Sequence, residues 1–374
     1  MKIGIISIME GYSWGGSEEL WVEMALVALA NGHQIEASVK HWGTPNSKLD
    51  LLKKMGAVIH FRKKSVLQRA RNKIAYNLGI SSYSSFFDSY VPDLTLISEG
   101  SAFEFTKNLY WTNFALDTSF PYCFIIQNVF ESESLNNERR KRALSVYKKA
   151  KALYFVSQRN IEVVQRQLAY EFSNAIVVNN PVSIPKFKSS LAGLSENDTT
   201  INFASVGRLD CHSKGQDILL QVLSMPAWKT RNWHLNIYGI GQDYDHLVKL
   251  ATFYQVNDKV SFHKYIPATK IWQTNHLLIM PSYNEGTSLA LLEAMSYGIP
   301  AVITNVGGQA EWIEDEVNGF VVAAPTINLL DQALEKCWLM KSEWQEMGIR
   351  ASEKIIKHYP RSAGEMLFEK IQQL

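Results

Sequence analysis

The sequence has few cysteines, and they lie far apart. Cys123, Cys211 and Cys337 are the only three in 374 residues, and none of them forms a CxxC pair. An even-numbered disulfide framework of the kind found in small secreted proteins is therefore excluded. We expect reduced thiols and a cytoplasmic chain.

Long apolar runs are also lacking. The N-terminal segment MKIGIISIMEGY has only a short apolar run before a glutamate, which does not predict a signal peptide. No run of about 18 uninterrupted apolar residues occurs, so no membrane-spanning helix is expected.

A strong net charge is absent too. The formal charge is +2, which gives no reason to expect a nucleic acid partner. Residues 1–180 nevertheless hold 21 Lys and Arg against 16 Asp and Glu. Two clusters concentrate the basic charge, RKKSVLQRARNK (62–73) and RRKRALSVYKKAK (139–151). Peripheral contact with an anionic membrane is one interpretation, and a solvated surface is the other.

Apolar residues are plentiful, at 46% of a chain long enough for two domains. Short strand patterns alternate with helical patterns in both halves, and residues 181–200 between them lack periodicity. Strands are expected at 2–8, 34–40, 94–98, 122–128, 152–157 and 175–180, and then at 201–207, 233–239, 260–266, 276–282, 301–306 and 319–323. The pattern predicts an α/β chain with two Rossmann-like domains, each built on a parallel sheet.

Two glycines, Gly15 and Gly16, separate the first strand from a helix pattern for which Ser17 is the expected N-cap. A helix N-terminus receives anions, and glycine lets a ligand approach the backbone closely. The spacing is not G-x-G-x-x-G and no acidic residue ends the second strand, which argues against a dinucleotide-dependent oxidoreductase. An ordinary strand-to-helix turn is the alternative.

The segment SVGRLDCHSKGQDILL (205–220) places Arg208 and Lys214 in one strand-to-helix loop. Two permanent cations at the C-terminal edge of a parallel sheet suit a diphosphate. A solvated loop with two surface cations is the alternative.

The segment LNIYGIGQDYDHL (235–247) contains Asp243 and Asp245. A D-x-D triplet can hold a divalent metal together with a sugar-nucleotide diphosphate. We favour a structural role, in which Gly239 and Gly241 make the turn and the two acids lie in the first turn of a helix. No metal site is therefore predicted, and metal dependence stays an alternative.

The segment PSYNEGTSLALLEAMSYGIPAV (281–302) carries two glutamates with seven residues between them. Glu285 lies in a loop after a strand, and Glu293 lies in the helix that follows. The N-terminus of this helix would face a phosphate at the sheet edge. Glu293, roughly 6–9 Å further along the axis, could accept hydrogen bonds from the two hydroxyls of a ribose. An ion pair with a cation on a neighbouring helix is the alternative.

Together these motifs resemble the C-terminal half of family 4 glycosyltransferases, which are retaining enzymes of the GT-B fold. The matching segments are GRLDCHSKGQD, IYGIG, PSYNEGTSLALLEAMSYGIPAV and TNVGGQAEWIEDEVNGFVV, and GGSEE in the first half is a looser match. The resemblance implies two Rossmann-like domains with parallel sheets that face each other across a cleft. Residues 1–182, with a final helix at 361–374, would form the acceptor domain, and residues 183–360 would form the nucleotide-sugar donor domain.

The resemblance also implies roles for single residues. Arg208 and Lys214 would bind the donor diphosphate and stabilise the leaving group, Glu285 would contact the transferred sugar, and Glu293 would bind the ribose. The other donor-binding residues implied are Gly15, Gly16, Gly239, Gly286, Thr287, Ser288 and Leu289.

The sequence departs from the family pattern at two places. Five residues separate Arg208 from Lys214, where four is usual, so that loop is expected to bulge. Many members have a histidine where this chain has Gln127 and Asn128. We infer that Gln127 or Asn128 lines the sugar or acceptor pocket.

The function implied is retaining transfer of a hexosyl or related group from a UDP- or GDP-sugar to a glycan or lipid-linked acceptor. Cell-surface polysaccharide or glycoconjugate synthesis, in the cytoplasm or on the inner face of the membrane, is the expected setting, with no cofactor. The alternatives are a metal-dependent transferase that uses Asp243 and Asp245, a non-catalytic sugar-nucleotide binder, and a sugar-nucleotide epimerase.

Overall fold

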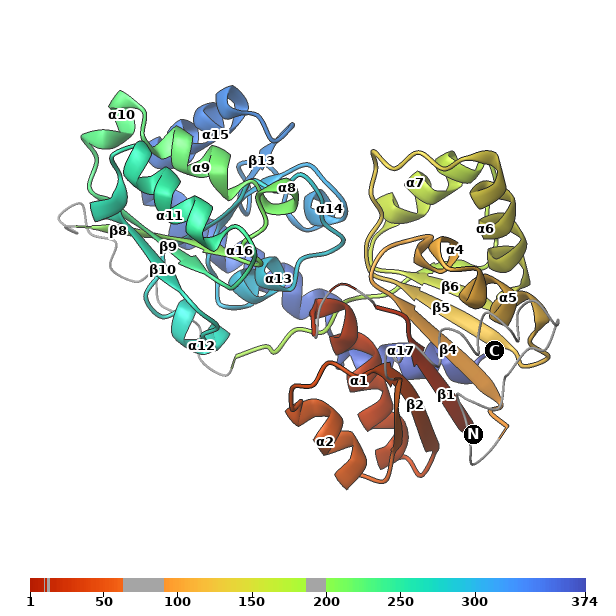
Figure 1. Ribbon diagram of the computed structural model, residues 1–374. Helices are drawn as coiled ribbons and strands as arrows, with labels where there is room; N and C mark the ends of the chain where they lie inside the picture. The colour runs from red at the N-terminus through yellow and green to blue at the C-terminus, as the bar shows by residue number, and fades with distance from the viewer. Residues whose placement is uncertain (10, 12–13, 63–90, 186–199) are drawn as a thin grey trace. The chain divides into compact units, whose positions relative to one another are not determined.

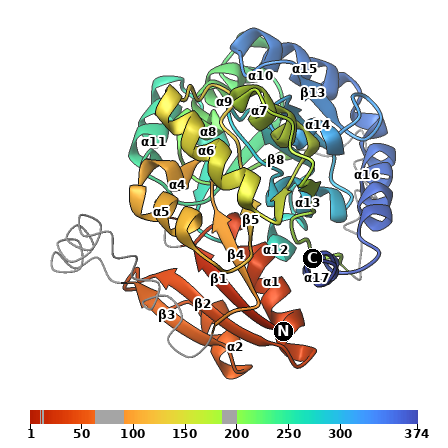
Figure 2. The ribbon, with the colours of Figure 1, turned by 90° about the vertical axis from the view of Figure 1, so that its right-hand side faces the viewer.

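The computed structural model describes residues 1–9, 11, 14–62, 91–185 and 200–374 (Figures 1 and 2). This part of the chain divides into two compact units. Unit 1 holds Met1–Pro181 and Arg361–Leu374, and unit 2 holds Val182–Pro360. Most of the expected connection at 181–200 and most of the first basic cluster at 62–73 lie outside the described residues.

The sheet of unit 1 is parallel throughout, with strand order β3-β2-β1-β4-β5-β6-β7 in the described residues. Central strands such as β5, with the sequence YCFII, are buried and apolar along their whole length, as expected for a sheet covered on both faces. The strands are β1 (Lys2–Ser7), β2 (Gln34–Lys40), β3 (Val58–Arg62), β4 (Leu94–Glu99), β5 (Tyr122–Ile126), β6 (Ala152–Phe155) and β7 (Ala175–Val177).

The helices of unit 1 come from both ends of the chain. They are α1 (Gly16–Ala30), α2 (Ser47–Lys54), α4 (Glu104–Lys107), α5 (Leu109–Asp117), α6 (Asn137–Lys149), α7 (Gln158–Leu168) and α17 (Ala363–Gln372). The C-terminal helix α17 packs against α1, and both views show the two side by side (Figures 1 and 2). The Gly364 amide donates to Glu23 Oε2 of α1 over 3.1 Å, which joins the last helix to the first.

The sheet of unit 2 is also parallel, with strand order β10-β9-β8-β11-β12-β13 in the described residues. The strands are β8 (Ile201–Val206), β9 (Trp233–Tyr238), β10 (Val260–His263), β11 (Leu277–Met280), β12 (Ala301–Thr304) and β13 (Phe320–Val322). The prediction of two Rossmann-like α/β domains is therefore confirmed.

The helices of unit 2 alternate with its strands. They are α8 (Cys211–Lys214), α9 (Gln216–Leu223), α10 (Pro226–Lys229), α11 (Tyr244–Phe253), α12 (Ala268–Ile271), α13 (Leu289–Ser296), α14 (Gln309–Trp312), α15 (Ile327–Leu339) and α16 (Trp344–His358), with 3-10 turns at Asn257–Lys259 and Lys341–Glu343. Within the residues described, no helix is both long and apolar enough to cross a membrane.

Candidate functional site

The strand order of unit 2 changes direction at β8. From β8 the chain continues to β9 and β10 on one side of the sheet, and it then returns to β11, β12 and β13 on the other. The loops that follow β8 and β11 therefore diverge at the topological switch point, where open α/β sheets bind their ligands. The first of these loops carries Arg208 and Lys214, and the second carries Glu285.

Lys214 and Glu285 form an ion pair at this edge. Lys214 Nζ lies 2.5 Å from Glu285 Oε1, and the Ser282 hydroxyl donates to the same carboxylate oxygen over 2.9 Å. The two charged side chains are mostly buried, with 17% and 7% of their surfaces exposed. A buried ion pair adds little net stability, because desolvation offsets the attraction between the charges. The position of the pair at the switch point makes it a candidate ligand contact.

A single helical turn, α8, brings Lys214 to this position. The Asp210 carbonyl accepts the Lys214 amide over 2.8 Å, and Gly215 then reverses the chain with φ of 63°. A Cβ at Gly215 would lie 2.2 Å from the Pro281 carbonyl oxygen. The loop from Arg208 to Lys214, for which the sequence predicts a bulge, contains this turn. Half-buried Arg208 lies at the start of the loop, and its carbonyl accepts a hydrogen bond from Gln216 Nε2 over 2.7 Å.

Two glycines let the loops around the ion pair touch backbone to backbone. A Cβ at Gly239, after β9, would lie 1.9 Å from the Gly207 carbonyl oxygen. A Cβ at Gly307, after β12, would lie 1.9 Å from the Glu285 carbonyl oxygen. Both glycines have φ in the left-handed region, at 146° and 53°. Gly239 therefore supports the Arg208 loop, and Gly307 supports the Glu285 loop.

The helix α13 begins directly after the Glu285 loop. Ser288 is its N-cap residue and makes no side-chain capping bond, and Gly286, Thr287 and Leu289 lie beside it. Glu293 is half-buried and lies about 6 Å along the axis from Leu289, as four residues of helix require. Burial, and then the charge of Glu293, raise the pKa of Tyr297 one turn later.

The two aspartates of the D-x-D segment take separate positions. Asp243 Oδ2 accepts a hydrogen bond from the backbone amide of Cys211 over 2.8 Å. Its side chain therefore binds the first residue of α8. Asp243 is the N-cap residue of α11, at the start of the helix as expected, but its side chain makes no capping bond to that helix. Asp245 is exposed in the first turn of α11. In the described ranges, no group of three or more His, Cys, Asp or Glu is placed to hold a metal ion.

In unit 1 the glycine loop after β1 leads directly into α1. The helix begins at Gly16 with Gly15 as its N-cap in an extended conformation, so the predicted N-cap role of Ser17 is wrong. Ser17 instead directs its hydroxyl to the sulfur of Met9 over 3.1 Å. Gly15 makes no side-chain capping bond, since glycine has no side chain to accept the amides of the first turn.

Buried polar side chains gather at the C-terminal ends of β4 and β5 in the same unit. Gln127 and Asn128 follow β5, and Ser101 lies just after β4. Gln127 Nε2, Asn128 Oδ1 and Ser101 Oγ are all buried, and none has a hydrogen-bond partner among the described residues. Buried polar atoms in native proteins nearly always have a partner, so this sheet edge has hydrogen-bonding capacity for a polar ligand or water.

Glu99 and Tyr147 at this edge were missed by the sequence reasoning. Glu99 ends β4 fully buried and accepts the Tyr147 hydroxyl over 2.5 Å. Burial raises the pKa of Glu99 well above its usual range, and burial together with Glu99 does the same for the pKa of Tyr147. The signal in the sequence was the acidic residue that ends the apolar strand LTLIS.

Comparison with known families gives a match that falls within unit 2. Residues 188–354, less than half of the chain, match the model described as "Glycosyl transferases group 1". The chain is 33% identical over 174 residues to an uncharacterized glycosyltransferase of Haemophilus influenzae, with 45% of this chain and 47% of the relative covered. It is 28% identical over 165 residues to the lipopolysaccharide 1,6-galactosyltransferase of Escherichia coli, with 42% and 44% covered. The chain therefore spans less than half the length of these relatives.

Solved structures match over the whole chain. The HepE protein of Anabaena, solved in complex with UDP-glucose, has a TM-score of 0.74 at 17% identity, with 100% of both chains covered. Sucrose-phosphate synthase from Thermosynechococcus elongatus has a TM-score of 0.74 at 16% identity, with 100% of this chain and 97% of that chain covered. Similarity at this level of identity supports the fold, so the prediction of a GT-B fold is confirmed.

Proposed function

We propose that this protein is a retaining glycosyltransferase. It moves a hexosyl or related group from a UDP- or GDP-sugar to a hydroxyl of a glycan or lipid-linked acceptor, in cell-surface polysaccharide or glycoconjugate synthesis. The ion pair between Lys214 and Glu285 at the switch point of unit 2 is the observation that carries the proposal. The group 1 match over this unit and the lipopolysaccharide galactosyltransferase relative support it.

In the proposed reaction, the bond between the anomeric carbon and the β-phosphate oxygen breaks, and its electron pair stays on the phosphate. Arg208 and Lys214 stabilise the negative charge that develops there, because cations already in place need no reorganisation during the reaction. The acceptor oxygen bonds to the anomeric carbon from the same face. Its proton passes to the leaving phosphate, so no side-chain base is required. Glu285, which is paired with the Lys214 ammonium, contacts the transferred sugar.

The remaining contacts bind the substrates. The backbone from Gly286 to Leu289 and the turn at Gly239 hold the donor phosphates, and Glu293 binds the ribose. Gly15 and Gly16 approach the donor from the first domain, which holds the acceptor. Gln127 or Asn128 lines the sugar or acceptor pocket, a role supported by the buried atoms Gln127 Nε2 and Asn128 Oδ1, which have no partner among the described residues.

A donor panel tests the proposal. UDP-glucose, UDP-galactose, UDP-N-acetylglucosamine and GDP-mannose should be incubated with a glycan acceptor extract, and the release of nucleoside diphosphate should be measured. UDP donors come first because the HepE structures contain UDP and UDP-glucose. The anomeric proton coupling of the product, read by NMR, should show the configuration of the donor. A ligand-induced rise in melting temperature without any turnover would support the non-catalytic binder instead. Conversion of the sugar nucleotide without acceptor would support the epimerase.

The metal-dependent alternative has its own test. Asp243 is bonded to a backbone amide and Asp245 is exposed on α11, so we expect transfer to continue at an unchanged rate after EDTA treatment. Loss of activity with EDTA, restored by Mg²⁺ or Mn²⁺, would favour the alternative.

The proposal also includes peripheral contact with an anionic membrane through the basic clusters at 62–73 and 139–151. In the second cluster, Arg139 pairs with Glu133, Arg140 donates to the Gln167 carbonyl, and Lys149 donates to the Thr118 carbonyl. These side chains help to hold unit 1 together, which weakens this cluster as a membrane contact. Most of the first cluster lies outside the described residues. Sedimentation with phosphatidylglycerol vesicles that falls as salt rises would support docking, and equal sedimentation with neutral vesicles would contradict it.

A further inference from the structure

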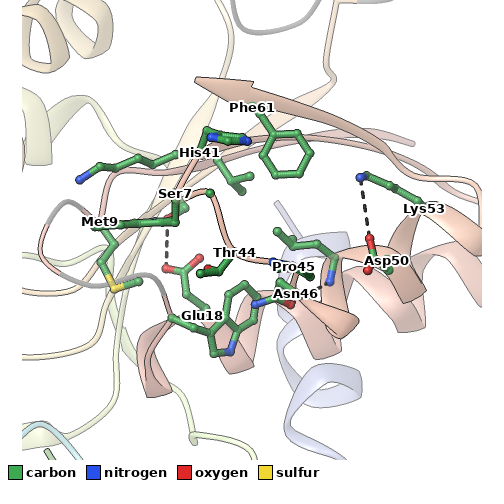
Figure 3. Close-up of a pocket in the computed structure, with 16 residues that line it drawn as sticks. Ser7, Met9, Glu18, His41, Thr44, Pro45, Asn46, Asp50, Lys53 and Phe61 are labelled. Atoms are coloured by element: carbon green, nitrogen blue, oxygen red, sulfur yellow. Dashed lines mark hydrogen bonds and ion pairs between the residues drawn. The ribbon is translucent and has the colours of Figure 1, made fainter. Parts of the chain in front are cut away.

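Unit 1 contains a cavity of about 350 Å³ beside the ends of β1 and β2 (Figure 3). Its size falls within the roughly 300–1,000 Å³ typical of small-molecule sites. It lies on the other side of β1 from the polar side chains that follow β4 and β5. All the residues that line it belong to unit 1, and they come from β1 and the loop after it, α1, β2, the 41–46 loop, α2 and β3.

Aromatic rings make up much of the cavity wall. Trp14, Trp42 and Phe61 line it, and the His41 ring meets the Phe61 ring edge to face with centroids 5.7 Å apart. Figure 3 shows His41 and Phe61 on one side of the cavity and the turn from Thr44 to Asn46 on the other. A pyranose ring has C–H faces and a rim of hydroxyls, so it can pack on aromatic rings while its rim reaches polar groups. The mixture of rings and polar side chains therefore suits a sugar.

Two lysines bring positive charge to the cavity. Lys40 Nζ lies 3.7 Å from the centroid of the Trp42 ring, and Lys53 Nζ lies 4.7 Å from that of Phe61. Lys53 also faces Asp50 Oδ1 at 3.9 Å, but both side chains are about half exposed, and such a pair is weak. The ammonium groups lie on the same rings that would hold the sugar. This places positive charge where an acidic substituent of that sugar would lie.

A buried carboxyl group lies at the far end of the cavity from Lys53. Glu18 accepts the Ser7 hydroxyl over 3.0 Å and the Trp21 indole N–H over 2.8 Å. Figure 3 shows the Glu18–Ser7 bond at one end and the Asp50–Lys53 contact at the other. Each carboxyl oxygen can accept more than one hydrogen bond, so Glu18 can still bind a sugar hydroxyl. Hydroxyl recognition and charge recognition thus lie at opposite ends.

We propose that this cavity binds one anionic sugar residue of the acceptor, a sugar that carries a carboxylate or a phosphate. Trp42 and Phe61 hold the ring, Lys40 and Lys53 select the negative charge, and Glu18 binds a hydroxyl. This proposal rests on the proposed function, because it assigns the acceptor class that the enzyme would use. The binding of the sugar itself can be tested without turnover.

Binding should be measured by calorimetry on the full chain with saturating UDP, which keeps the probes out of the proposed donor site. Four probes separate the contributions of ring and charge: methyl glucuronide, glucose 6-phosphate, methyl glucoside and inorganic phosphate. We expect at least one of the two anionic sugars to bind ten-fold or more tightly than methyl glucoside and inorganic phosphate. The tighter binder of methyl glucuronide and glucose 6-phosphate then identifies the acidic group as a carboxylate or a phosphate. The proposal would be overturned if neither anionic sugar binds. It would also be overturned if methyl glucoside or inorganic phosphate binds as tightly as the anionic sugars.

Matched variants tie the binding to the cavity. Lys40→Met and Lys53→Met should each weaken the anionic sugar at least five-fold and leave methyl glucoside unchanged, whereas Trp42→Ala and Phe61→Ala should weaken both. Lys107→Met and Phe253→Ala alter exposed side chains outside the cavity and should change neither. A cavity variant enters the comparison only if its melting temperature matches wild type. If variants with native melting temperatures bind the anionic sugars as wild type does, the proposal is wrong.

Acceptor kinetics separate this proposal from the proposed function. If the chain transfers sugar and the four cavity variants leave the acceptor KM unchanged, the cavity proposal fails and the transferase stands. If no donor is turned over while the anionic sugars bind with the expected variant pattern, the transferase fails and the cavity stands as an anionic-sugar site.

Discussion

At the scale of single residues, the ion pair of Lys214 and Glu285 joins two loops that lie 71 positions apart in the sequence. Lys214 follows β8 and Glu285 follows β11, and these two strands are neighbours in the sheet of unit 2. Their direct contact makes each residue part of the environment of the other.

Lys214→Ala should lower kcat by roughly 10²–10³, because the ammonium acts where charge develops in the transition state. Glu285→Gln should also act mainly on kcat, because it removes the carboxylate that holds Lys214 Nζ at 2.5 Å. Steady-state kinetics with the identified donor checks both, with exposed Lys249→Ala on α11 as the control. An unchanged kcat in Lys214→Ala would remove this lysine from the reaction.

Glu293→Gln should mainly raise the donor KM, by roughly ten-fold to a hundred-fold. The ribose does not change during the reaction, so a lost contact to it weakens ground state and transition state alike. The same kinetic series measures this effect after each variant has shown a native melting profile. A fall in kcat with unchanged KM would mean that Glu293 does not bind the ribose.

Glu18→Gln should stabilise the protein at alkaline pH and much less at acidic pH. Burial raises the pKa of Glu18 from 4.5 to about 7, against the lowering effect of the hydrogen bonds from Trp21 and Ser7. The native state therefore keeps a proton that the unfolded state loses, and stability falls as pH rises from about 4.5 to 7. The loss is roughly 3 kcal/mol and persists above pH 7. Glutamine can keep both bonds, since the Ser7 hydroxyl can accept as well as donate.

Urea unfolding at pH 5 and pH 8 measures this difference. Glu162→Gln, at an exposed position of α7, serves as the control and should leave the pH dependence unchanged. The same gain from Glu18→Gln at both pH values would mean that the Glu18 carboxyl does not titrate in this range.

At the scale of elements, strands were easier to predict than helix starts and loops. Buried parallel strands are dense in β-branched residues, and the sequence showed them in both halves. The edge strand β3 was missed because VIHFR is short and only partly buried, so its pattern is weak. Ser17 was wrongly chosen as the N-cap because serine often caps helices, whereas the N-cap of α1 lies two residues earlier, at Gly15. The helix α8 could not be predicted, because four residues are too few to show the apolar periodicity of a helix.

Gly239→Ala should destabilise unit 2 far more than Gly298→Ala. Both glycines have a left-handed φ, at 146° and 75°, which alone costs alanine roughly 1–2 kcal/mol. Only at Gly239 would the Cβ also meet a backbone oxygen at 1.9 Å, whereas at Gly298 the nearest atom is 3.5 Å away. The added Cβ would also push apart the loops after β8 and β9. Because the loop after β8 carries Arg208, a proposed donor contact, we expect the donor KM to rise. Urea unfolding measures the difference, and equal losses in the two variants would mean that φ alone limits both positions.

At the scale of the whole molecule, alternating strand and helix patterns were enough to predict two parallel-sheet domains. The cavity of unit 1 could not be predicted from the sequence, because its lining comes from β1 and the loop after it, α1, the ends of β2 and β3, the 41–46 loop and α2. Nothing in the spacing of these residues indicates that they meet. The unpartnered polar atoms after β4 and β5 were hidden for the same reason, since only coordinates reveal which donors lack acceptors.

Each unit has its own sheet and packed helices, so a defect in one should spare the other. Gly364→Ala adds a Cβ that would lie 2.6 Å from the backbone carbon of Glu23, where α17 meets α1. Alanine usually stabilises a helix by roughly 0.5–1 kcal/mol over glycine, but this clash should reverse the sign and loosen unit 1. Gly348→Ala is its counterpart in unit 2, where the Cβ on α16 would lie 1.8 Å from the Gly298 carbonyl oxygen. Hydrogen exchange of the intact chain should show lost protection in α1 and β1 for Gly364→Ala, and in α13 and α16 for Gly348→Ala. Equal loss of protection in both units from either variant would mean that the chain unfolds as one cooperative body.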